Sequence, residues 1–478
     1  MVIYNICIVS AFRETFNKYH TLNRMKVCIN SQTPVVRFKI SYGDLLDKYG
    51  DLPDPLDLGE LEEGIDYEFT PGGVTNMLYP AVNNMLTSGF LEKVVWVSLG
   101  VNYPPRLSTG NLTISHVEIE ERVLRNYTTF KEGLWSEIHG IGKSKFKQDE
   151  FNAYAIYNWE NAKKMFEYMS DTDLFYVQDF QLLMTGTFIG PSAPAVLRWH
   201  IPFVPEKMGT FARRVVIKGM ESFDAVVVST RRDLEGLIKS DYRGRAYQLY
   251  PYIDENEWKD APPPHELEKL KEKIGLRPDE RLVTVVARMD RIKSQDIAIK
   301  AFALASKREK LKLALVGDGS FSSSSKGGLS VGKGRAWRAE LERLVKELGL
   351  EDKVIFLGHS PKEELRAAYY LSSVVVLSSS LEGFGITVLE AWASKKPVVV
   401  SSGCGVSELV VNDSNGYVFQ PGDFETASQM ILKAIGSASD RLGENGFESS
   451  KQCFLTTAIE REKKIFEEVG REFKLDQE

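Results

Sequence analysis

The chain has 478 residues, of which 43% are hydrophobic and 26% charged, and it carries a formal net charge of −6. These values are typical of soluble globular proteins, and the length accommodates two or three domains. Nucleic-acid binding needs a basic surface, so the acidic balance argues against a nucleic-acid partner, although a small anionic substrate needs only a local cluster of Lys and Arg.

The sequence shows no clear membrane-spanning segment or signal peptide, and its cysteine spacing indicates no disulfide or metal site. No apolar run approaches the ~20 residues that span a bilayer, and the first residues have an apolar patch without a basic start or a clean cleavage site. Cys7, Cys28, Cys404 and Cys453 lie far apart without CxxC or CxxH spacing, which indicates neither a disulfide frame nor a zinc site. We expect a cytoplasmic protein with buried or reduced thiols and no membrane or metal partner.

The first half of the chain alternates strand and helix patterns. Residues 1–24 are ambiguous between an extra strand and an extension, and the acidic, proline-rich residues 41–66 predict a surface loop with one short helix. The expected strands are 25–29, 94–99, 112–118, 174–177, 195–199 and 225–229, and the expected helices are 75–86, 151–169 and 213–220.

A second alternating series follows a proline-rich break at 250–264. Its expected strands are 282–287, 311–316, 354–357, 374–377 and 397–400, and its expected helices are 295–305, 340–348, 363–368, 388–393, 425–435 and 457–473. Residues 320–335 are rich in Ser, Gly and basic residues and predict a loop. The alternation predicts an α/β fold with parallel sheets and helices on both faces. We expect domains at 1–250 and 251–454, with a helix at about 455–478 added to the first.

The stretch 374–401 reads as strand, glycine loop, helix and strand. Gly383 and Gly385 would allow a ligand close to the backbone, and the free N–H groups at the helix start favour an anion. Glu382 and Glu390 bracket the turn, and carboxylates accept hydrogen bonds from vicinal hydroxyls. Together these features outline a nucleotide-sugar site that includes Phe384.

Two other segments have anion-binding character. Gly72 and Gly73 precede a predicted helix, which makes them a candidate anion cradle. Arg288 and Lys293 follow the predicted strand 282–287, on the loop where a parallel sheet places its ligands. A guanidinium fork and an ammonium there could stabilise a departing diphosphate.

These motifs resemble those of the retaining two-domain glycosyltransferases of the GT-B fold. Glu382 and Glu390 match that family's E-x7-E pattern, and residues 405–410 with Asn415 and Gly416 match its downstream signature. The resemblance implies two Rossmann-like domains that face each other across a cleft, with a C-terminal helix that crosses back to the first domain.

The first half is similar to the trehalose-6-phosphate synthases in particular. The matching segments, in chain order, are 69–73 (FTPGG), 127–135 (YTTFKEGLW), 151–158 (FNAYAIYN), 177–182 (VQDFQL), 200–203 (HIPF) and 288–293 (RMDRIK). One position departs from the family: Gln32 stands where an Arg that holds the acceptor phosphate is expected, and neither Arg13 nor Arg37 is in register to replace it.

The resemblance assigns roles to individual residues. It implies catalytic roles for His200, Arg288, Lys293 and Asp179, and donor binding by Gly72, Gly73, Arg288, Lys293, Glu382, Gly383, Phe384, Gly385 and Glu390. It implies acceptor binding by Tyr127, Trp135 and Asp179, with Lys326, Lys333 and Arg335 of the basic loop as candidates for the acceptor phosphate. The alternative for Tyr127 and Trp135 is a place in the hydrophobic core, and the alternative for Asp179 is a helix N-cap.

The implied function is transfer of an α-glucosyl unit from UDP-, GDP- or ADP-glucose to glucose 6-phosphate, with retention and without a metal cofactor. The product would be trehalose 6-phosphate. Gln32 favours an alternative acceptor, such as free glucose or glycerol phosphate. A non-catalytic sugar-phosphate sensor and a nucleotide-sugar epimerase are further alternatives. The sequence leaves the donor base and the oligomeric state open, a homo-oligomer included.

Overall fold

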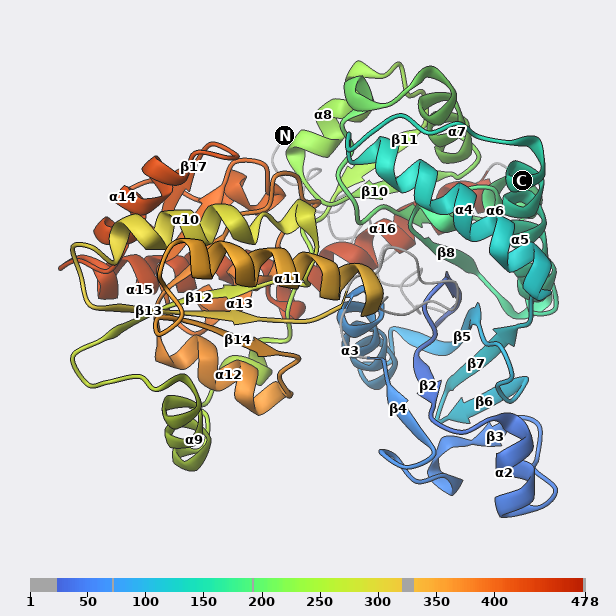
Figure 1. Cartoon of the computed structure of the whole chain (residues 1–478). Coiled ribbons are helices and arrows are strands. Elements are labelled where there is room, and N and C mark those ends of the chain that lie inside the picture. The colour runs from blue at the N-terminus through green and yellow to red at the C-terminus, as the bar shows by residue number, and fades with distance from the viewer. Residues whose placement is uncertain (1–23, 71–72, 191–192, 320–330, 476–478) are drawn as a thin grey trace, which may run out of the picture.

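Two α/β domains lie side by side in the computed structural model of the chain (Figure 1). The structure describes residues 24–70, 73–190, 193–319 and 331–475. Each domain is built on a mainly parallel sheet with helices on both faces. The expected fold class, two Rossmann-like domains with a C-terminal helix that returns to the first, is confirmed.

The first domain holds a sheet with the order β11-β10-β9-β8-β1-β5-β7-β6-β3, which counts nine strands among the described residues. The β6–β7 pair is antiparallel and the other pairs are parallel. The strands are β1 (Met25–Ser31), β3 (Leu56–Asp57), β5 (Leu91–Leu99), β6 (Arg106–Thr109), β7 (Leu112–Val117), β8 (Leu174–Gln178), β9 (Ala195–Arg198), β10 (Ala225–Val228) and β11 (Arg245–Gln248). A separate antiparallel pair joins β2 (Val36–Phe38) and β4 (Tyr67–Phe69).

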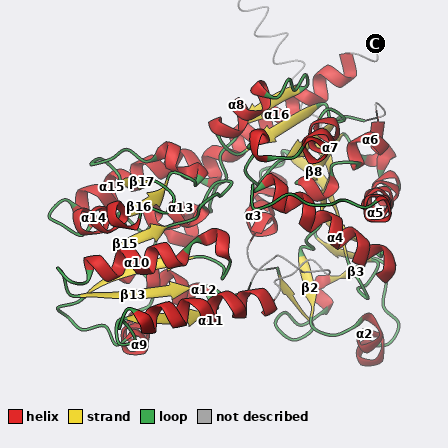
Figure 2. Cartoon of the chain, turned by 45° about the horizontal axis from the view of Figure 1, so that its top comes forward, coloured by secondary structure: helices red, strands yellow, loops and turns green. Residues whose placement is uncertain are grey.

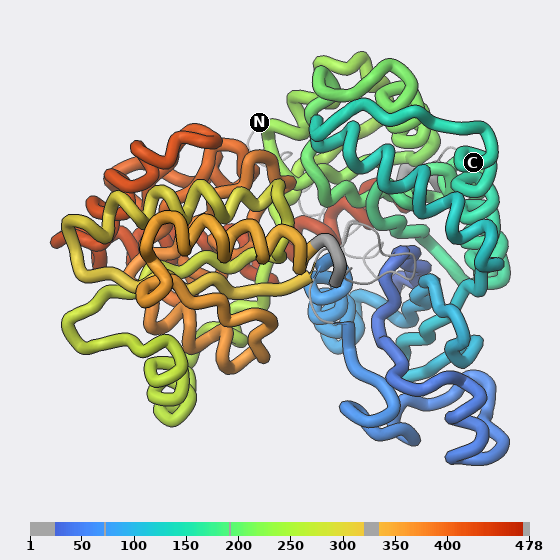
Figure 3. The backbone as a smooth tube through the Cα atoms, viewed as in Figure 1, coloured from blue at the N-terminus to red at the C-terminus, as the bar shows by residue number. Residues whose placement is uncertain are grey.

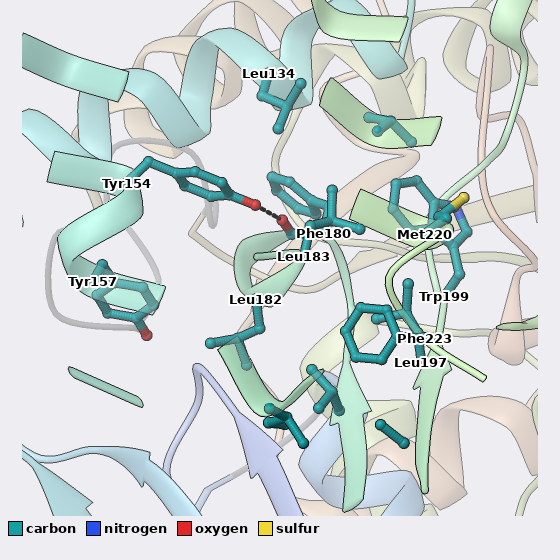
Figure 4. Close-up of a cluster of buried hydrophobic side chains, with 14 of the residues drawn as sticks. Leu134, Tyr154, Tyr157, Phe180, Leu182, Leu183, Leu197, Trp199, Met220 and Phe223 are labelled. Carbon is teal, nitrogen blue, oxygen red and sulfur yellow. Dashed lines mark hydrogen bonds between the residues drawn. The ribbon is translucent and has the colours of Figure 1, made fainter. Parts of the chain in front are cut away.

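Helices cover both faces of this sheet because its strands are apolar on both sides. In β8, Phe175 and Val177 pack into one core while Leu174 and Tyr176 pack into the other, as the two-residue repeat of a strand requires. The helices of this domain are α2 (Tyr42–Tyr49), α3 (Gly73–Thr87), α4 (Glu121–Ile138), α5 (Gln148–Phe166), α6 (Thr185–Ile189), α7 (Thr210–Met220) and α8 (Arg231–Lys239). Part of the first core is shown in Figure 4, where the Tyr154 hydroxyl donates to the Phe180 carbonyl over 2.5 Å.

The second domain has a fully parallel sheet in the order β14-β13-β12-β15-β16-β17. Its strands are β12 (Arg281–Val286), β13 (Leu311–Val316), β14 (Val354–Gly358), β15 (Ser372–Leu377), β16 (Val398–Ser401) and β17 (Tyr417–Phe419). Its helices are α9 (Pro264–Ile274), α10 (Gln295–Ala305), α11 (Val331–Glu347), α12 (Lys362–Leu371), α13 (Ile386–Ala393), α14 (Phe424–Ala434) and α15 (Ser439–Ser450). Helices α10, α11 and α14 pack on one face, and α9, α12 and α13 on the other.

The last helix, α16 (Leu455–Leu475), leaves the second domain and packs on the first. Its apolar residues Ile459, Phe466 and Val469 are buried with α3 in the core of the first domain. Figures 2 and 3 show the same path, with the helix running from the second domain into the first. The chain therefore crosses between the domains twice, once near Tyr252 and once before α16.

Some of the secondary structure differs from the expected elements: several elements, among them α6, α8, α9, α15, β6 and β11, were not predicted, and two differences concern the site. Residues 331–335 were expected in the basic loop, but they form the first turn and more of α11. The 18-residue helix α4 was not predicted as a helix, although its buried residues Leu124, Tyr127, Lys131 and Leu134 follow a helical repeat. Polar residues interrupt that repeat, which explains why the pattern was missed. Residues 1–24, apart from Arg24, lie outside the described part of the chain.

Candidate active site

A cavity of about 650 Å³ lies between the two domains. The first domain contributes the ends of its strands and one side of α4, and the second contributes the loop after β12 and the start of α11. The residues that line the cavity include Gln32, Gly73, Lys131, Glu132, Trp135, Asp179, Arg288, Asp290, Arg291, Trp337 and Glu340. A site at the carboxyl ends of parallel strands is the usual place for a ligand in this type of fold.

An ion pair that is largely shielded from solvent joins the segment after β12 to the loop after β15. The Lys293 ammonium lies 2.5 Å from Oε1 of Glu382, and the Ser379 hydroxyl donates to Oε2 of the same carboxylate over 2.7 Å. Burial alone would raise the pKa of Glu382, but the charge and hydrogen bond of Lys293 outweigh it and lower the pKa. Glu382 is therefore ionised at neutral pH and orients Lys293. The sequence assigned these two residues to different parts of a donor, whereas the structure joins them.

The glycines of this loop are required by close contacts. A Cβ on Gly383 would come within 2.3 Å of the His200 carbonyl oxygen, so the two domains touch backbone to backbone at this point. Gly385 precedes α13 with φ of 112°, a conformation that strains other residues. Phe384 is 3% exposed and its ring packs 5.7 Å from that of Tyr250. The Phe384 side chain therefore belongs to the core and not to the cavity wall.

Glu390 lies within α13, where the Tyr369 hydroxyl donates to its Oε2 over 2.5 Å. Burial raises the pKa of Glu390 to about 7, so the carboxyl exchanges its proton near neutral pH. The residue sits five positions beyond Gly385, about 7–8 Å along the helix axis. This places Glu390 beside the loop of Glu382 and away from the 650 Å³ cavity.

Arg288 reaches the cavity from the loop after β12. Burial lowers its pKa, with Asp290 and Glu382 acting in the opposite direction, but a guanidinium keeps its charge at any physiological pH. The Gln295 side chain donates to the Arg288 carbonyl over 2.7 Å and holds the loop. Arg288 thus places a permanent positive charge in the cavity wall, as the sequence predicted.

The end of β8 places three polar residues next to one another. The His200 backbone N–H donates to Oδ1 of Asp179 over 3.3 Å, and His200 Nε2 lies 2.9 Å from Oε1 of Gln178. Because an amide oxygen only accepts, this contact assigns the proton to Nε2. Burial and the charge of Arg198 lower the pKa of His200 well below its usual range, so the ring is neutral.

Asp179 lines the cavity in an unusual backbone conformation, with φ of 68°. Burial raises the pKa of this carboxyl to about 7. A carboxyl that titrates near neutrality can both accept and donate a proton, which is a property often found in catalytic acids and bases. Asp179 immediately precedes the short 3₁₀ helix Phe180–Leu182, which is the position of an N-cap residue. The Asp179 side chain, however, makes no capping hydrogen bond to that helix.

The residues predicted to bind the acceptor lie in different environments in the structure. Trp135 lines the cavity, with its ring 4.1 Å from that of His139. Tyr127, one helical face away, is fully buried and stacks on Tyr157 at 3.9 Å, so its assignment to the acceptor wall was wrong and the core alternative was right. Arg335 is exposed on α11 instead of standing in a loop over the cavity.

Three of the predicted residues have little or no structural description. Gly72 and Lys326 lie outside the described residues, and for Lys333 only the helical backbone is described. Gly73, the neighbour of Gly72, begins α3 with φ of 68° and lines the cavity.

Sequence reasoning missed two cations in the cavity wall, Lys131 and Arg291. Lys131 lies on α4, one turn before Trp135. Arg291 forms an ion pair with Glu340 and stacks on Trp337 at 4.7 Å. The i, i+4 spacing of Lys131 and Trp135 was a signal in the sequence, but it could be used only once the segment was known to be helical.

Contacts away from the cavity connect the two domains. Arg232 of α8 donates to the carbonyls of Glu382 (2.9 Å) and Gly403 (3.1 Å). Glu408, in the short helix Gly405–Leu409, accepts from the backbone N–H of Arg231 over 3.1 Å and from the Tyr250 hydroxyl over 2.7 Å. The loop that carries Glu382 is thus bonded directly to the first domain.

The described residues contain no helix long and apolar enough to cross a membrane, and no group of three or more His, Cys, Asp or Glu placed to hold a metal ion. Of the cysteines, the three within the described ranges (Cys28, Cys404 and Cys453) are buried and free.

This two-domain arrangement, with its cavity at the facing strand ends, is the GT-B fold of glycosyltransferases. A solved E. coli structure described as trehalose-6-phosphate bound with UDP-2-fluoro glucose is similar over 93% of this chain and 99% of its own, with 15% identity and a TM-score of 0.72. A sucrose-phosphate synthase from Thermosynechococcus elongatus is similar over 93% and 99%, with 17% identity and a TM-score of 0.67. At these identities the likeness establishes the fold.

Sequence comparison finds a family model that matches most of the second domain. Residues 267–449 match the family model described as "Glycosyl transferases group 1". A D-inositol 3-phosphate glycosyltransferase from Catenulispora acidiphila is 28% identical over 239 residues, which are 48% of this chain and 52% of that protein. The chain thus spans about half the length of this curated relative. The predicted resemblance to GT-B glycosyltransferases is confirmed, with the trehalose-6-phosphate synthase fold among its structural neighbours.

Proposed function

We propose that the protein is a retaining glucosyltransferase that moves an α-glucosyl unit from a nucleotide-glucose to glucose 6-phosphate, giving trehalose 6-phosphate. The observation that carries this proposal is the shared cavity, which brings Arg288 of one domain opposite Asp179 and Trp135 of the other. A cation on one wall and a carboxyl with an aromatic ring on the other suit a sugar diphosphate and a sugar acceptor, respectively.

In the proposed reaction, the acceptor hydroxyl oxygen forms a bond to the anomeric carbon of the donor glucose. The bond from that carbon to the diphosphate oxygen breaks, and its electron pair leaves with the diphosphate. The hydroxyl proton passes to the departing phosphate oxygen on the same face. Arg288 and Lys293 stabilise the charge that develops on the diphosphate, and such preorganised cations commonly contribute a factor of 10² or more in rate.

The donor side of the proposal depends on the Glu382 loop. Glu382 holds Lys293 in place, and Gly383 brings this loop against the His200 carbonyl from the acceptor domain. The neutral His200 ring donates from Nε2 to Gln178, and in this proposal it donates to a donor-sugar hydroxyl when the donor binds. Glu390 accepts from the ribose hydroxyls in this proposal. The UDP-sugar bound in the E. coli neighbour supports a nucleotide-sugar donor.

A second acceptor class is favoured by one observation. Gln32, a neutral residue, lines the acceptor side of the cavity where the resemblance anticipates an arginine. A neutral or smaller acceptor, such as glucose or glycerol 3-phosphate, is therefore the second candidate.

The experiment incubates the full chain with UDP-, GDP- or ADP-glucose and with glucose 6-phosphate, glucose or glycerol 3-phosphate. We expect acceptor-dependent release of a nucleoside diphosphate, retention of the α configuration in the product, and unchanged release in EDTA. Arg288→Ala should lower kcat by 10²-fold or more. Donor binding without release for any acceptor would contradict the transfer proposal and favour a sensor, and donor conversion without an acceptor would favour an epimerase.

A further inference from the structure

Arg198 is a charged residue in the interior of the first domain. It is the last residue of β9, its side chain is fully buried, and its Nη2 donates to the Leu249 carbonyl over 2.7 Å. Among the described residues, Nε and Nη1 of Arg198 have no hydrogen-bond partner and the guanidinium has no ion pair. Such burial costs free energy, which an apolar side chain of similar length would not incur.

The alternation of β9 places Arg198 on the side of the sheet that α16 covers. Val196, two residues earlier, is buried in the same core as the apolar residues of α16, and a strand repeats its faces every two residues. Burial raises the pKa of Tyr176 on the neighbouring strand, and of the charged groups Glu462 raises it further while Arg198 lowers it. Arg198 therefore lies in a buried layer between the sheet and α16, near the Tyr176–Glu462 hydrogen bond.

Gln178 connects this layer to His200. Gln178 is the partner of Arg198 in the register of β8 and β9, and its Nε2 donates to the Tyr176 carbonyl over 3.3 Å. This leaves Oε1 of Gln178 to accept from His200 Nε2 over 2.9 Å. His200 follows Arg198 by two residues, and burial together with the charge of Arg198 keeps the pKa of the ring well below its usual range. Gln178 thus acts on the imidazole through a hydrogen bond, and Arg198 acts on it through charge.

The elements packed around His200 carry other titratable groups, several of them carboxyls whose negative charge favours a protonated imidazole. Among the cations, Lys293 is ion-paired with Glu382, and Arg232 is partly exposed, so that solvent screens its charge. Arg198 is buried without an ion pair among the described residues, so its charge acts at longer range. The groups concerned are Asp179 after β8, Arg232 and Asp233 on α8, Glu462 on α16, and Lys293, Glu382 and Glu408 in the second domain.

We propose that Arg198 is a positioning residue for the glycosyl transfer: its buried charge holds His200 in the uncharged form, with the single ring proton on Nε2, when a diphosphate enters the cleft. The inference rests on the proposed function and deepens it. A diphosphate brings negative charge toward His200, and that charge would draw a second proton to the ring.

The consequence concerns release of the product. The nucleoside diphosphate has one more ionisable oxygen than the nucleotide-glucose, because its bond to the sugar has been broken. A charged His200 would hold this product more tightly than the donor and slow its departure. An uncharged ring, which donates one hydrogen bond, avoids that preference.

The experiment uses the full chain and four substitutions. Arg198→Gln removes the charge and keeps a donor for the Leu249 carbonyl, and Arg198→Met removes both. Arg198→Lys retains the charge, and Arg214→Met, which removes an exposed arginine from α7, is the matched control. Thermal unfolding verifies that each variant folds, as we expect because a buried charge without an ion pair contributes little to stability.

NMR of histidine-labelled protein follows the His200 ring from about pH 5 to pH 8, with His200→Gln to assign its signal. Spectra are recorded with and without whichever of UDP, GDP and ADP binds the wild type most tightly. Calorimetry measures the affinity for that diphosphate, and steady-state kinetics are measured where transfer occurs.

We expect the wild-type ring to stay uncharged, with its proton on Nε2, in both states. In the diphosphate complexes of Arg198→Gln and Arg198→Met, the ring should take up a second proton within this pH range. Where it is charged, both variants should bind the diphosphate about tenfold more tightly than the wild type and have a lower kcat, whereas at pH 8 they should match it within about threefold. Arg198→Lys and Arg214→Met should behave as the wild type.

A ring that stays uncharged in the diphosphate complexes of both neutral variants would overturn the inference, and so would a wild-type ring that takes up a second proton. A loss of kcat that is equal at all pH values would show a structural role and overturn it as well, as would failure of both neutral variants to fold. The expected titration and affinities without any glucosyl transfer would support the inference and contradict the proposed reaction.

Discussion

Several ionisable side chains around the cleft have pKa values displaced toward neutrality by burial. The pKa values of Asp179 and Glu390 are raised to about 7, and that of Lys131 is lowered to about 8. Asp179 and Lys131 line the cavity, and Glu390 lies beside the Glu382 loop. Burial of these groups therefore carries a desolvation cost, and pKa values displaced in this way are common at functional sites.

Glu390→Gln tests whether the buried carboxyl lowers the stability of the fold while it contributes to donor binding. Its carboxyl has a pKa of about 7 when folded and near 4.5 when unfolded, so the folded state loses stability as pH rises from 4.5 through 7. We expect the variant to be more stable than the wild type at pH 8, by an amount on the order of 2 kcal/mol, with the difference vanishing toward pH 4.5. Donor KM should rise at least tenfold because an amide has one accepting oxygen.

The measurements are denaturant unfolding at both pH values and donor kinetics at pH 8. Glu351→Gln, which alters an exposed glutamate in the same domain, is the matched control and should change neither quantity. Equal stability of Glu390→Gln and the wild type at pH 8 would contradict the burial cost that we assign to this carboxyl.

At the scale of elements, α16 is attached to the first domain by a buried polar contact as well as by apolar packing. Glu462 is 1% exposed and accepts from the hydroxyls of Tyr176 (2.5 Å) and Tyr252 (3.0 Å). Tyr176 belongs to β8 and Tyr252 to the crossing between the domains. One carboxylate therefore joins the last helix, the central sheet and the linker.

Glu462→Ala should destabilise the protein by about 3 kcal/mol, because it leaves two buried hydroxyls without their acceptor and creates a cavity. Glu460→Ala removes an exposed partner of Lys463 on the same helix and should cost less than ~1 kcal/mol. Denaturant unfolding measures both. A loss below ~1 kcal/mol in Glu462→Ala would show that apolar packing alone attaches α16.

At the scale of the whole molecule, the contact between domains sets the geometry of the donor loop. Arg232 bonds two carbonyls of the second domain, one of them that of Glu382, and Glu408 accepts from the start of α8. Together with the Gly383–His200 approach, these contacts connect the relative position of the domains to the position of the Lys293–Glu382 pair.

Arg232→Ala should therefore impair function more than stability. We expect donor kcat/KM to fall tenfold or more, with a change in unfolding free energy below ~1.5 kcal/mol, because partly exposed polar contacts contribute little to folding. Small-angle scattering should show a wider separation of the domains. Arg231→Ala is the control, since Arg231 takes part through its backbone N–H and its side chain is exposed. Identical kinetics in the two variants would contradict the proposed coupling.

Much of the architecture could be predicted from local patterns. Apolar runs that alternate with amphipathic segments predicted two parallel α/β units, and the apolar runs around the glycine loop in 374–401 predicted a strand, a loop and a helix. Such patterns can be recognised in the sequence because each depends on residues that are close to one another along the chain. The helix α4 and the start of α11 were missed because polar or glycine-rich residues obscure their periodicity.

The sequence by itself determined the fold class and the loops that carry the candidate site. Only the tertiary structure decided which side chains face the cavity, because that depends on which neighbours, distant in sequence, cover each face of a helix. Trp135 faces the cleft while Tyr127, two turns earlier, is buried against α5. The position of Lys131 in the cavity wall depends on the same packing of α4. Gly383 contacts the His200 carbonyl only because the two domains come together.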